Sequence, residues 1–301
     1  MVVFQALTWE ARDGEDEHLI SIFGKTEDGK SVCVTTAFTP YFFIKLPSGV
    51  DSQKVQRIYD ILGNQCKDSL VAYSLMKSKD VWGFQNNEEF AYMKINFKDL
   101  QARRLVDSFL RRPLDRSPEL YEIFGVRNVK VYESNLDPVL RLMHRTGIQS
   151  TGWLDSGERC VRSHIANVDI DLFCNDWTTL KPVARDDIAP FVVASVDIEC
   201  NSSTGKFPDA NIPGDACFQI AISLCKFGSD EPYDKACLCY KQTDSNLEGC
   251  DIRSYATEKE MLEAFQKYLH SKDIDIITGW NIFGFDMEYI YKRAQINKCN
   301  Y

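Results

Sequence analysis

The most constraining feature of this sequence is an apolar stretch, residues 192–200, that carries two acids two positions apart, Asp197 and Glu199. Apolar residues at most of the other positions predict a largely buried strand. Side chains at positions i and i+2 of a strand lie on one face, so both carboxylates are expected to point the same way. Two neighbouring anions on a buried strand are costly unless a cation lies between them. The pattern therefore predicts a divalent-metal site.

The chain has 301 residues, of which 44% are hydrophobic, enough to supply a core for each of two domains. It has no run of about 18 apolar residues, and charged residues interrupt its first seventeen positions. We therefore expect no membrane span, no signal peptide and an intracellular location. The formal net charge of −9 argues against non-specific coating of nucleic acid, but an enzyme with a local groove fits it, because carboxylates bind Mg²⁺.

The eleven cysteines are scattered and odd in number, and several lie in apolar strand-like runs. We interpret them as reduced thiols of the core rather than a disulfide framework. The close pair Cys237 and Cys239 has no second Cys or His pair near it, so no structural zinc site is expected.

The N-terminal half begins with strand-like runs at residues 2–7, 18–23 and 31–35, which predict a small antiparallel sheet. Strand, helix, strand, strand, helix and strand patterns follow. Their expected positions are residues 41–46, 51–63, 70–76, 90–95, 97–112 and 129–132. The second helix is expected to place Leu105, Val106 and Phe109 inward. This βαββαβ order predicts a ferredoxin-like unit, which occurs in RNA-recognition modules and in many other domains.

Two features of this unit leave nucleic-acid contact open. Tyr73 and Tyr92 lie on its central strands, where we favour core packing over base stacking. Five arginines form the densest basic cluster in the chain, which we interpret as a solvated helix face rather than a phosphate site. They are Arg103, Arg104, Arg111, Arg112 and Arg116.

A domain boundary is expected near residue 190, where Asp186, Asp187 and Pro190 interrupt the pattern after a last strand at residues 165–172. Longer apolar strands then follow at residues 191–200, 217–227 and 236–240. A capping-box match at Thr257 starts a helix, and a short strand at residues 274–278 precedes a final helix. The sequence thus predicts an α+β or α/β protein, with a mixed domain at residues 1–189 and the first part of an RNase H-like fold at residues 190–301.

The turn before the last helix delivers a third acid, Asp286. In a sheet whose first and fourth strands are neighbours, Asp286 can reach Asp197 and Glu199. Three carboxylates can hold two Mg²⁺ ions about 4 Å apart, the arrangement used for in-line attack of water on a phosphodiester.

At these residues the sequence resembles the family B DNA polymerases. Asp197-Ile-Glu199 is similar to the first exonuclease motif of that family, and the segment from Asn281 to Asp286 is similar to the second. Further similarity to delta-type members, including those of large DNA viruses, lies in residues 38–43, 131–135 and 140–143 and at Trp153. The resemblance implies that Asp197, Glu199 and Asp286 bind two Mg²⁺ ions, for which Mn²⁺ can substitute. It also implies that Asn281 and Phe285 contact the frayed primer end.

The resemblance implies a wider function as well. The chain would be the N-terminal and proofreading 3′→5′ exonuclease portion of a DNA-directed DNA polymerase, with DNA synthesis in a missing C-terminal part. Its partners would be primer-template and single-stranded DNA, with a sliding clamp bound through the missing part, in the nucleus or a viral replication compartment. The third exonuclease motif, a Tyr followed four residues later by Asp, is absent from the sequence. We therefore expect these 301 residues alone to be nearly inactive.

Two other functions stay open at the level of sequence. One is a stand-alone DEDD-type exonuclease, and the other is a nucleic-acid-binding module without catalysis.

Pairs of acids on strands also arise without metals. Asp169 and Asp171 form a second such pair, which we interpret as turn-proximal or exposed because no partner acid motif follows it.

Overall fold

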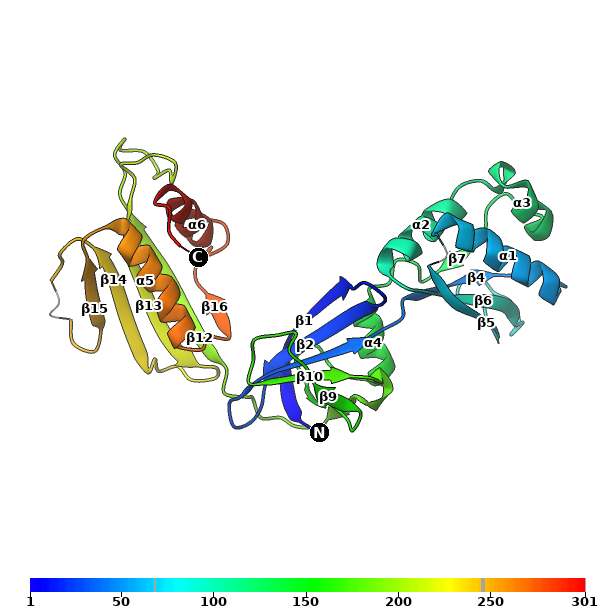
Figure 1. Ribbon diagram of the computed structural model, residues 1–301, viewed down its shortest axis with the longest axis horizontal. Coiled ribbons are helices and arrows are strands. Elements are labelled where there is room, and N and C mark those ends of the chain that lie inside the picture. The colour runs from blue at the N-terminus through cyan, green and yellow to red at the C-terminus, as the bar shows by residue number, and fades with distance from the viewer. Residues whose placement is uncertain (68, 245–246, 301) are drawn as a thin grey trace. The chain divides into compact units, whose positions relative to one another are not determined.

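The computed structural model describes residues 1–67, 69–244 and 247–300, which form two compact units (Figure 1). Unit 1 contains Met1–Thr26 and Lys30–Arg185, and unit 2 contains Glu27–Gly29 and Asp186–Tyr301. Both units combine helices with sheets, so the predicted mixed fold is confirmed. The domain limits at residues 189 and 190 stay a prediction, and each unit is described by itself.

Unit 1 contains a seven-stranded sheet with the order β11-β8-β1-β2-β3-β10-β9. Its strands are β1 (Val3–Asp13), β2 (His18–Lys25), β3 (Ser31–Ala37), β8 (Trp153–Asp155), β9 (Cys160–Arg162), β10 (Ile170–Cys174) and β11 (Lys181–Val183). The first three strands are antiparallel neighbours, as the sequence pattern predicts. Helix α4 (Pro138–Thr146) packs Leu142 against Ile20 and Phe38.

The strand expected at residues 165–172 is shorter than predicted and begins only at Ile170. The N–H groups of Ile165 and Ala166 donate instead to the carboxylate of Asp171, at 2.5 and 2.9 Å. These bonds fold the preceding segment into a turn, so its apolar residues do not enter the sheet.

The second sheet of unit 1 has the order β5-β6-β4-β7, with antiparallel neighbours throughout. Its elements are β4 (Tyr41–Lys45), α1 (Ser52–Gln65), β5 (Leu70–Ser78), β6 (Phe90–Phe97), α2 (Leu100–Leu110), α3 (Pro118–Phe124) and β7 (Val131–Tyr132). The first and third strands are central, so the ferredoxin-like unit is confirmed, with α3 as an addition. The side chains of Asp51 and Asp99 cap α1 and α2 by accepting backbone N–H groups.

Helices α1 and α2 bury one face of this sheet. Ile58, Leu62 and Val106 pack against Phe42 and Met93 in a common core. Leu105, which we expected to face inward, is exposed, because α2 turns Val106 and Leu110 toward the sheet instead.

Neither Tyr73 nor Tyr92 is an exposed stacking ring, and Tyr73 lies on the edge strand β5 rather than on a central strand as expected. Tyr92 is buried with its ring against Tyr132, at 5.5 Å between centroids. Tyr73 packs on Tyr59 and donates its hydroxyl to Gln56. The structure thus agrees with core packing.

The arginine cluster divides between core and solvent. Arg103 is buried and donates to the carbonyl of Leu136, whereas Arg111 is exposed and pairs with Asp107 one turn earlier in α2. The other three arginines of the cluster are exposed, so most of the cluster forms a solvated face.

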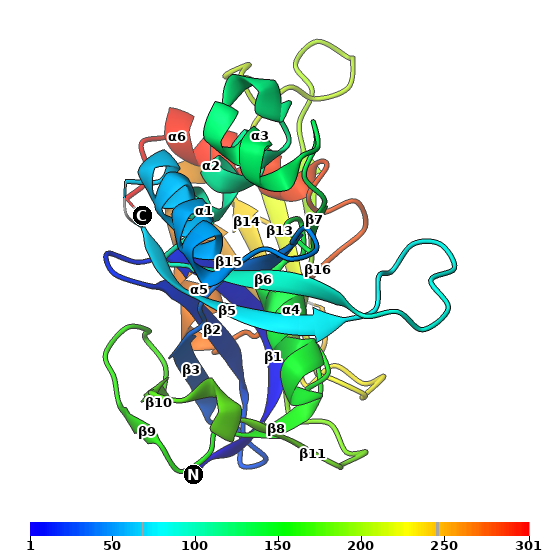
Figure 2. The ribbon, with the colours of Figure 1, turned by 90° about the vertical axis from the view of Figure 1, so that its right-hand side faces the viewer.

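The loop between β5 and β6 extends away from its sheet (Figure 2). Asp80 anchors its base by accepting from Lys45 Nζ at 2.8 Å and from the Tyr132 hydroxyl at 2.9 Å. The hydrogen bond from Lys45, supported by Tyr132, lowers the pKa of Asp80 to about 2. Trp82 and Phe84 beyond this anchor are exposed.

Unit 2 is built on a five-stranded sheet with the order β15-β14-β13-β12-β16. Its elements are β12 (Val192–Cys200), β13 (Cys217–Lys226), β14 (Asp234–Tyr240), β15 (Asp251–Tyr255), α5 (Glu258–Ser271), β16 (Ile276–Thr278) and α6 (Asp286–Ile296). The expected first and fourth strands, β12 and β16, are parallel neighbours, as the RNase H-like arrangement requires. Strand β15 is an addition at the sheet edge, parallel to β14.

Helices α5 and α6 share one core with this sheet. Alternate residues of β12, Ala194, Val196 and Ile198, are buried against it together with Phe265 of α5 and Ile290 of α6. The predicted capping box is present: the Thr257 hydroxyl accepts from Glu260 N, and the Glu260 carboxylate accepts from Thr257 N.

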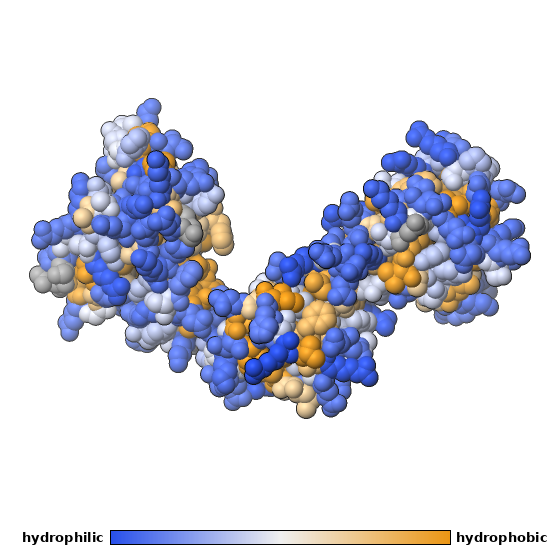
Figure 3. Space-filling model, in the orientation of Figure 1, coloured by the Kyte–Doolittle hydropathy of each residue, from blue (hydrophilic) through white to orange (hydrophobic). Residues whose placement is uncertain are grey.

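Hydrophilic side chains cover most of the surface visible in Figure 3, with scattered hydrophobic positions. Among the described residues, no helix is long and apolar enough to cross a membrane.

Substitution of two adjacent phenylalanines of β4 would test the assigned core of the four-stranded sheet. Phe42 is fully buried, whereas Phe43 lies on the opposite face and is half-buried. We expect Phe42→Ala to lower the free energy of unfolding by about 3–5 kcal/mol, because it leaves a cavity. The matched Phe43→Ala variant should lose only about 1 kcal/mol. Denaturant unfolding followed by circular dichroism measures both, and equal losses would contradict the assigned core.

Candidate metal site

Strand β12 presents its two acids on one face. Asp197 and Glu199 are exposed together with Ser195, while the intervening Val196 and Ile198 are buried. The alternation read from the sequence therefore corresponds to the geometry of the strand. Both carboxylates can reach a ligand above this face.

Asp286 begins α6 and lies at the edge of β12. Its carboxylate Oδ1 accepts the backbone N–H of Ile198, the residue between the two exposed acids, at 3.2 Å. Strand β16 pairs only with Val193–Ser195, so the continuing edge of β12 is bonded by this side chain instead. The three acids of the two sequence motifs thus come from neighbouring elements.

Asp286 is only 3% exposed. Burial raises the pKa of its carboxyl, and the negative charge of Asp197 raises it further. The cost of ionising Asp286 therefore comes first from burial and then from the charge of Asp197, and a cation bound between the two carboxylates would reduce it.

The acids do not form a closed set of ligands. Within the part of the chain that the structure describes, no three His, Cys, Asp or Glu side chains converge closely enough to hold a metal ion. Like charges that lack a cation repel one another, and the exposed side chains of Asp197 and Glu199 are free to separate. The donor chemistry, three carboxylates with one anchored to the backbone, nevertheless fits a hard divalent cation.

The turn between β16 and α6 depends on two glycines and an asparagine. A Cβ at Gly279 would lie 2.4 Å from the carbonyl oxygen of Val196, so only glycine passes this close to β12. Asn281 adopts φ +50°, a region that asparagine tolerates better than most residues, and its carbonyl accepts from Gly284 N and Phe285 N. A Cβ at Gly284 would collide with the Asn281 side chain at 2.3 Å. This tight turn fixes where Asp286 enters α6.

Aromatic rings surround this turn. Phe285 is half-buried and packs edge-on against Phe207, at 5.2 Å between centroids, and against Tyr289 at 5.3 Å. Trp280 and Phe283 flank Asn281 and are 92% and 82% exposed. Asn281 and Phe285 were predicted from the sequence as site residues, whereas Trp280, Phe283 and Phe207 were not. Aromatic residues interleaved with a glycine-rich turn beside an acid motif are the sequence signal that could have indicated them.

An open groove adjoins the acid pair. It has a volume of about 690 Å³ and runs over β12, β13 and β14. Asp197, Gln219, Lys235 and Trp280 are among its lining residues. The groove therefore combines a candidate metal ligand, an exposed ring and a cation.

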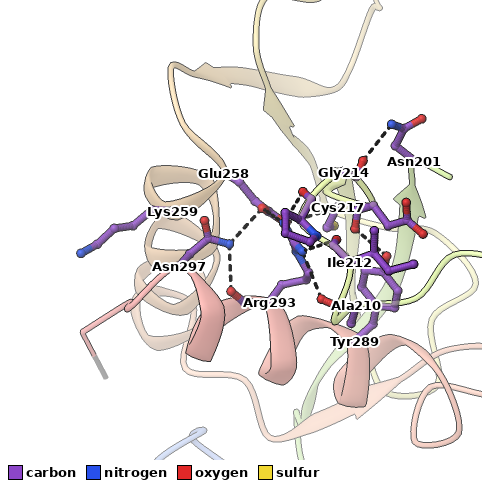
Figure 4. A network of polar contacts seen from close by, with 12 residues as sticks. Asn201, Ala210, Ile212, Gly214, Cys217, Glu258, Lys259, Tyr289, Arg293 and Asn297 are labelled. Atoms are coloured by element: carbon purple, nitrogen blue, oxygen red, sulfur yellow. Dashed lines mark hydrogen bonds and ion pairs between the residues drawn. The ribbon is translucent and has the colours of Figure 1, made fainter. Parts of the chain in front are cut away.

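A buried ion pair holds the elements behind the site together (Figure 4). Arg293 of α6 pairs with Glu258 of α5 at 2.5 Å, and their side chains are 3% and 6% exposed. Arg293 also donates to the carbonyls of Ala210 and Ile212, at 3.1 and 3.0 Å. Glu258 Oε1 accepts the N–H of Cys217 at 2.9 Å. The pair thus connects both helices with β13 and the loop at residues 201–216, and it was not predicted from the sequence.

The same loop is ordered from within by Asp215. This fully buried carboxylate accepts from the Ser203 hydroxyl at 2.5 Å, from Ser203 N at 2.7 Å and from Asp209 N at 3.0 Å. The hydrogen bond from the Ser203 hydroxyl is the largest cause of its lowered pKa. The Tyr289 hydroxyl donates to the Asp215 carbonyl at 2.7 Å, which ties the loop to α6.

The second acid pair of the sequence has a different role. Asp169 accepts from both N and Oγ of Ser31, each at 2.9 Å, and Asp171 accepts the two N–H groups of the preceding turn. These carboxylates stabilise loops of unit 1.

Comparison with known proteins gives a consistent result. The family model for the exonuclease domain of DNA polymerase family B matches residues 129–301. The chain is 32% identical to a DNA polymerase of Acanthamoeba polyphaga mimivirus, over 96% of this chain and 18% of that protein. It is 31% identical to a DNA polymerase of Paramecium bursaria Chlorella virus NY2A, over 98% of this chain and 31% of that protein. It is 28% identical to the DNA polymerase delta catalytic subunit of Schizosaccharomyces pombe, over 92% of this chain and 26% of that protein.

A solved structure shares the fold. The family B DNA polymerase of the archaeon Pyrobaculum calidifontis matches with a TM-score of 0.67 and 18% identity, over 99% of this chain and 33% of that one. The chain therefore spans about a fifth to a third of the length of the proteins it is similar to.

Neighbouring residues of α6 test the buried ion pair. Arg293→Met leaves Glu258 buried without its cation, so we expect a loss of about 3–5 kcal/mol in the free energy of unfolding. Lys292 forms an exposed pair with Glu288 one turn earlier, and Lys292→Met should cost less than about 0.5 kcal/mol. Urea unfolding of both variants separates the two effects, and a small loss for Arg293→Met would refute the supporting role of the pair.

The raised pKa of Asp286 gives a pH-dependent prediction for the metal-free protein. The folded state holds this proton more tightly than the unfolded state, so stability falls as pH rises through the interval between the two pKa values. Asp286→Asn retains an oxygen that can accept from Ile198 N and removes the charge. We expect it to raise the thermal midpoint by a few degrees in mildly alkaline buffer with EDTA.

In acid buffer near the ordinary carboxyl pKa of about 4, Asp286→Asn and the wild type should have the same thermal midpoint. Calorimetry at both pH values measures it. A variant that is less stable than the wild type at alkaline pH would contradict the assigned electrostatics.

Proposed function

Because the chain belongs to the family B DNA polymerases, we propose that it carries the proofreading 3′→5′ exonuclease centre of a DNA-directed DNA polymerase. The observation that carries this proposal is the hydrogen bond from Ile198 N to Asp286. It joins the second acid motif to the backbone between Asp197 and Glu199 of the first. The similarity to family B polymerases then gives this arrangement of acids its chemical meaning.

The two halves of the chain have separate roles in this proposal. Residues 1–189 form the N-terminal domain of the polymerase, and residues 190–301 form part of the RNase H-like exonuclease domain. The division of the structure between Arg185 and Asp186 supports this boundary. Since the chain spans only part of its relatives, DNA synthesis is assigned to the parent protein outside these residues.

Asp197, Glu199 and Asp286 would hold the divalent cations, two Mg²⁺ ions or Mn²⁺ in their place. When bound, such ions activate water and stabilise the leaving oxygen in phosphodiester hydrolysis. The chain's own residues supply the geometry: Asp286 is fixed by Ile198 N, while Asp197 and Glu199 are exposed and can close on a cation. A cation here would also remove the repulsion that raises the pKa of Asp286.

Asn281 and Phe285 would position the frayed primer end. Phe285 directly precedes Asp286 and packs against Phe207, and the turn that contains Asn281 passes close to β12 at Gly279. The exposed rings of Trp280 and Phe283 add surfaces on which unpaired bases can stack, each stack contributing about 1–3 kcal/mol. The substrates are thus primer-template and single-stranded DNA. A sliding clamp that binds the parent protein, and action in the nucleus or a viral replication compartment, complete the proposal.

A nucleic-acid-binding module without catalysis is the second candidate. The observation that favours it is the lack of a converged group of metal ligands among the described residues. Metal binding distinguishes this candidate from the exonuclease.

Titration with Mn²⁺, followed by electron paramagnetic resonance, tests the site without requiring turnover. We expect weak binding that Asp197→Ala and Asp286→Asn each reduce by about tenfold or more, as loss of a ligand does. Asp169→Asn is the matched control from the other acid pair and should bind like the wild type. Equal binding by all variants would favour the non-catalytic module.

Degradation of a 3′-labelled single-stranded oligonucleotide in Mg²⁺ tests the activity directly. We expect these 301 residues to remain near background, because the third motif is not among them. Robust degradation that Asp197→Ala abolishes would support the exonuclease and overturn the expected inactivity of this chain.

A further inference from the structure

A pair of cysteines lies directly beside the candidate metal site. Cys200 follows Glu199 at the end of β12 and is the register partner of Cys217 at the start of β13. A bulge between Glu199 and Cys200 shifts the register by one residue, and without it Cys200 would face Phe218. The bulge therefore creates the cysteine pair.

The backbone hydrogen bonds show which kind of pair this is. Asn201 N donates to the Ala216 carbonyl at 2.9 Å, so the next pair along the ladder is hydrogen-bonded. Because the two kinds of pair alternate between antiparallel strands, Cys200 and Cys217 form a non-hydrogen-bonded pair, with Cα atoms about 4.5 Å apart. This separation is within the range of about 4.4–6.8 Å that a disulfide requires.

The two side chains also meet. Cys200 packs against the core cluster that contains Cys217, and it is the largest cause of the raised pKa of the Cys217 thiol, ahead of burial. Cys217 is fully buried, whereas Cys200 is partly exposed, so Cys200 is the residue of the pair that a small oxidant would reach first.

Two other cysteine pairs of the chain can be compared with this one, and only the first shares its geometry. Cys160 and Cys174 of unit 1 are also register partners on antiparallel strands, flanked by a bond from Asn175 N to the Arg159 carbonyl. Cys237 and Cys239 have sulfurs 3.6 Å apart but lie two positions apart on one strand, so their Cα–Cβ bonds point in parallel instead of toward each other, as a disulfide requires. Two sulfurs that lie close together are therefore not sufficient for a disulfide; the two side chains must also point toward each other.

We propose that Cys200 and Cys217 are an oxidation site at which hydrogen peroxide forms a reversible cross-strand disulfide. The Cys200 thiol first loses its proton to solvent, and the thiolate attacks one peroxide oxygen. The O–O bond breaks, the sulfenic acid forms, and the departing hydroxide takes one proton from solvent and leaves as water. The Cys217 sulfur then attacks the Cys200 sulfur, the S–O bond breaks, and a second water leaves with the Cys217 proton. The two thiols lose two electrons in total, and the peroxide gains them.

The disulfide closes the loop at residues 201–216, which carries Phe207 and Asp215. It also fixes the end of β12 next to Glu199. A change in exonuclease activity on oxidation rests on the proposed function, whereas formation of the disulfide does not.

Mass spectrometry of the folded 301-residue chain tests the proposal. The protein is treated with a small excess of hydrogen peroxide, alkylated after unfolding, digested without reductant and compared with a sample reduced by dithiothreitol. We expect a peptide that links Cys200 with Cys217, and a second that links Cys160 with Cys174. Cys237 and Cys239 should be alkylated.

Matched serine variants separate the two pairs. Cys200→Ser should remove only the Cys200–Cys217 peptide, and Cys160→Ser should remove only the Cys160–Cys174 peptide. The oxidised wild type should unfold at a higher temperature than Cys200→Ser treated in the same way, because a crosslink restricts the unfolded chain.

Alkylation of Cys200 after peroxide treatment, with the Cys160–Cys174 peptide present as a positive control, would overturn the proposal. A Cys200–Cys217 peptide that appears only when the chain is oxidised in denaturant would overturn it as well. Mn²⁺ binding measured on reduced protein is independent of both results, so failure of the proposed function would be recognised separately.

Discussion

The buried ion pair between Arg293 and Glu258 is the interaction on which the candidate site depends. Glu258 lies in the first turn of α5, next to the capping box, while Arg293 lies two turns after Asp286 in α6. The pair also bonds β13 and the loop at residues 201–216. Burying two charges is costly, and such a pair is retained only where all its hydrogen-bonding groups find partners. Here those partners are the segments that surround the acids, so the bonds that offset desolvation also position α6.

The acids, in contrast to the ion pair, are electrostatically unfavourable in the folded chain. Asp286 is buried near Asp197, and its raised pKa shows that the folded chain resists its ionisation. A well-packed core beside an electrostatically unfavourable edge is the kind of local conflict that is expected at functional sites. The tight turn at Gly279 and Gly284 fixes Asp286 at this edge through the backbone rather than through attraction between side chains.

Much of unit 2 could be predicted from the sequence because its signals are local. Alternation in residues 192–200 gives the faces of β12, and Thr257 with Glu260 gives the start of α5. The three-residue strands β8, β9 and β11 have no comparable signal, since their pairing with distant strands defines them. The partners of Arg293 were missed for the same reason: its three carbonyl acceptors lie about 80 residues away, on a loop whose path the sequence pattern does not encode.

The bulge in β13 affects the positions of several neighbouring groups. By shifting the register after Glu199, it places Cys200 opposite Cys217 and starts the loop that carries Phe207 and Asp215. The pairing of β13 with β14 begins only at Gln219, so Cys217 N is not used by that ladder and donates to Glu258 instead. This strand end therefore also bonds to the buried ion pair. The register shift, the orientation of the helices and the position of the acids are therefore parts of one arrangement.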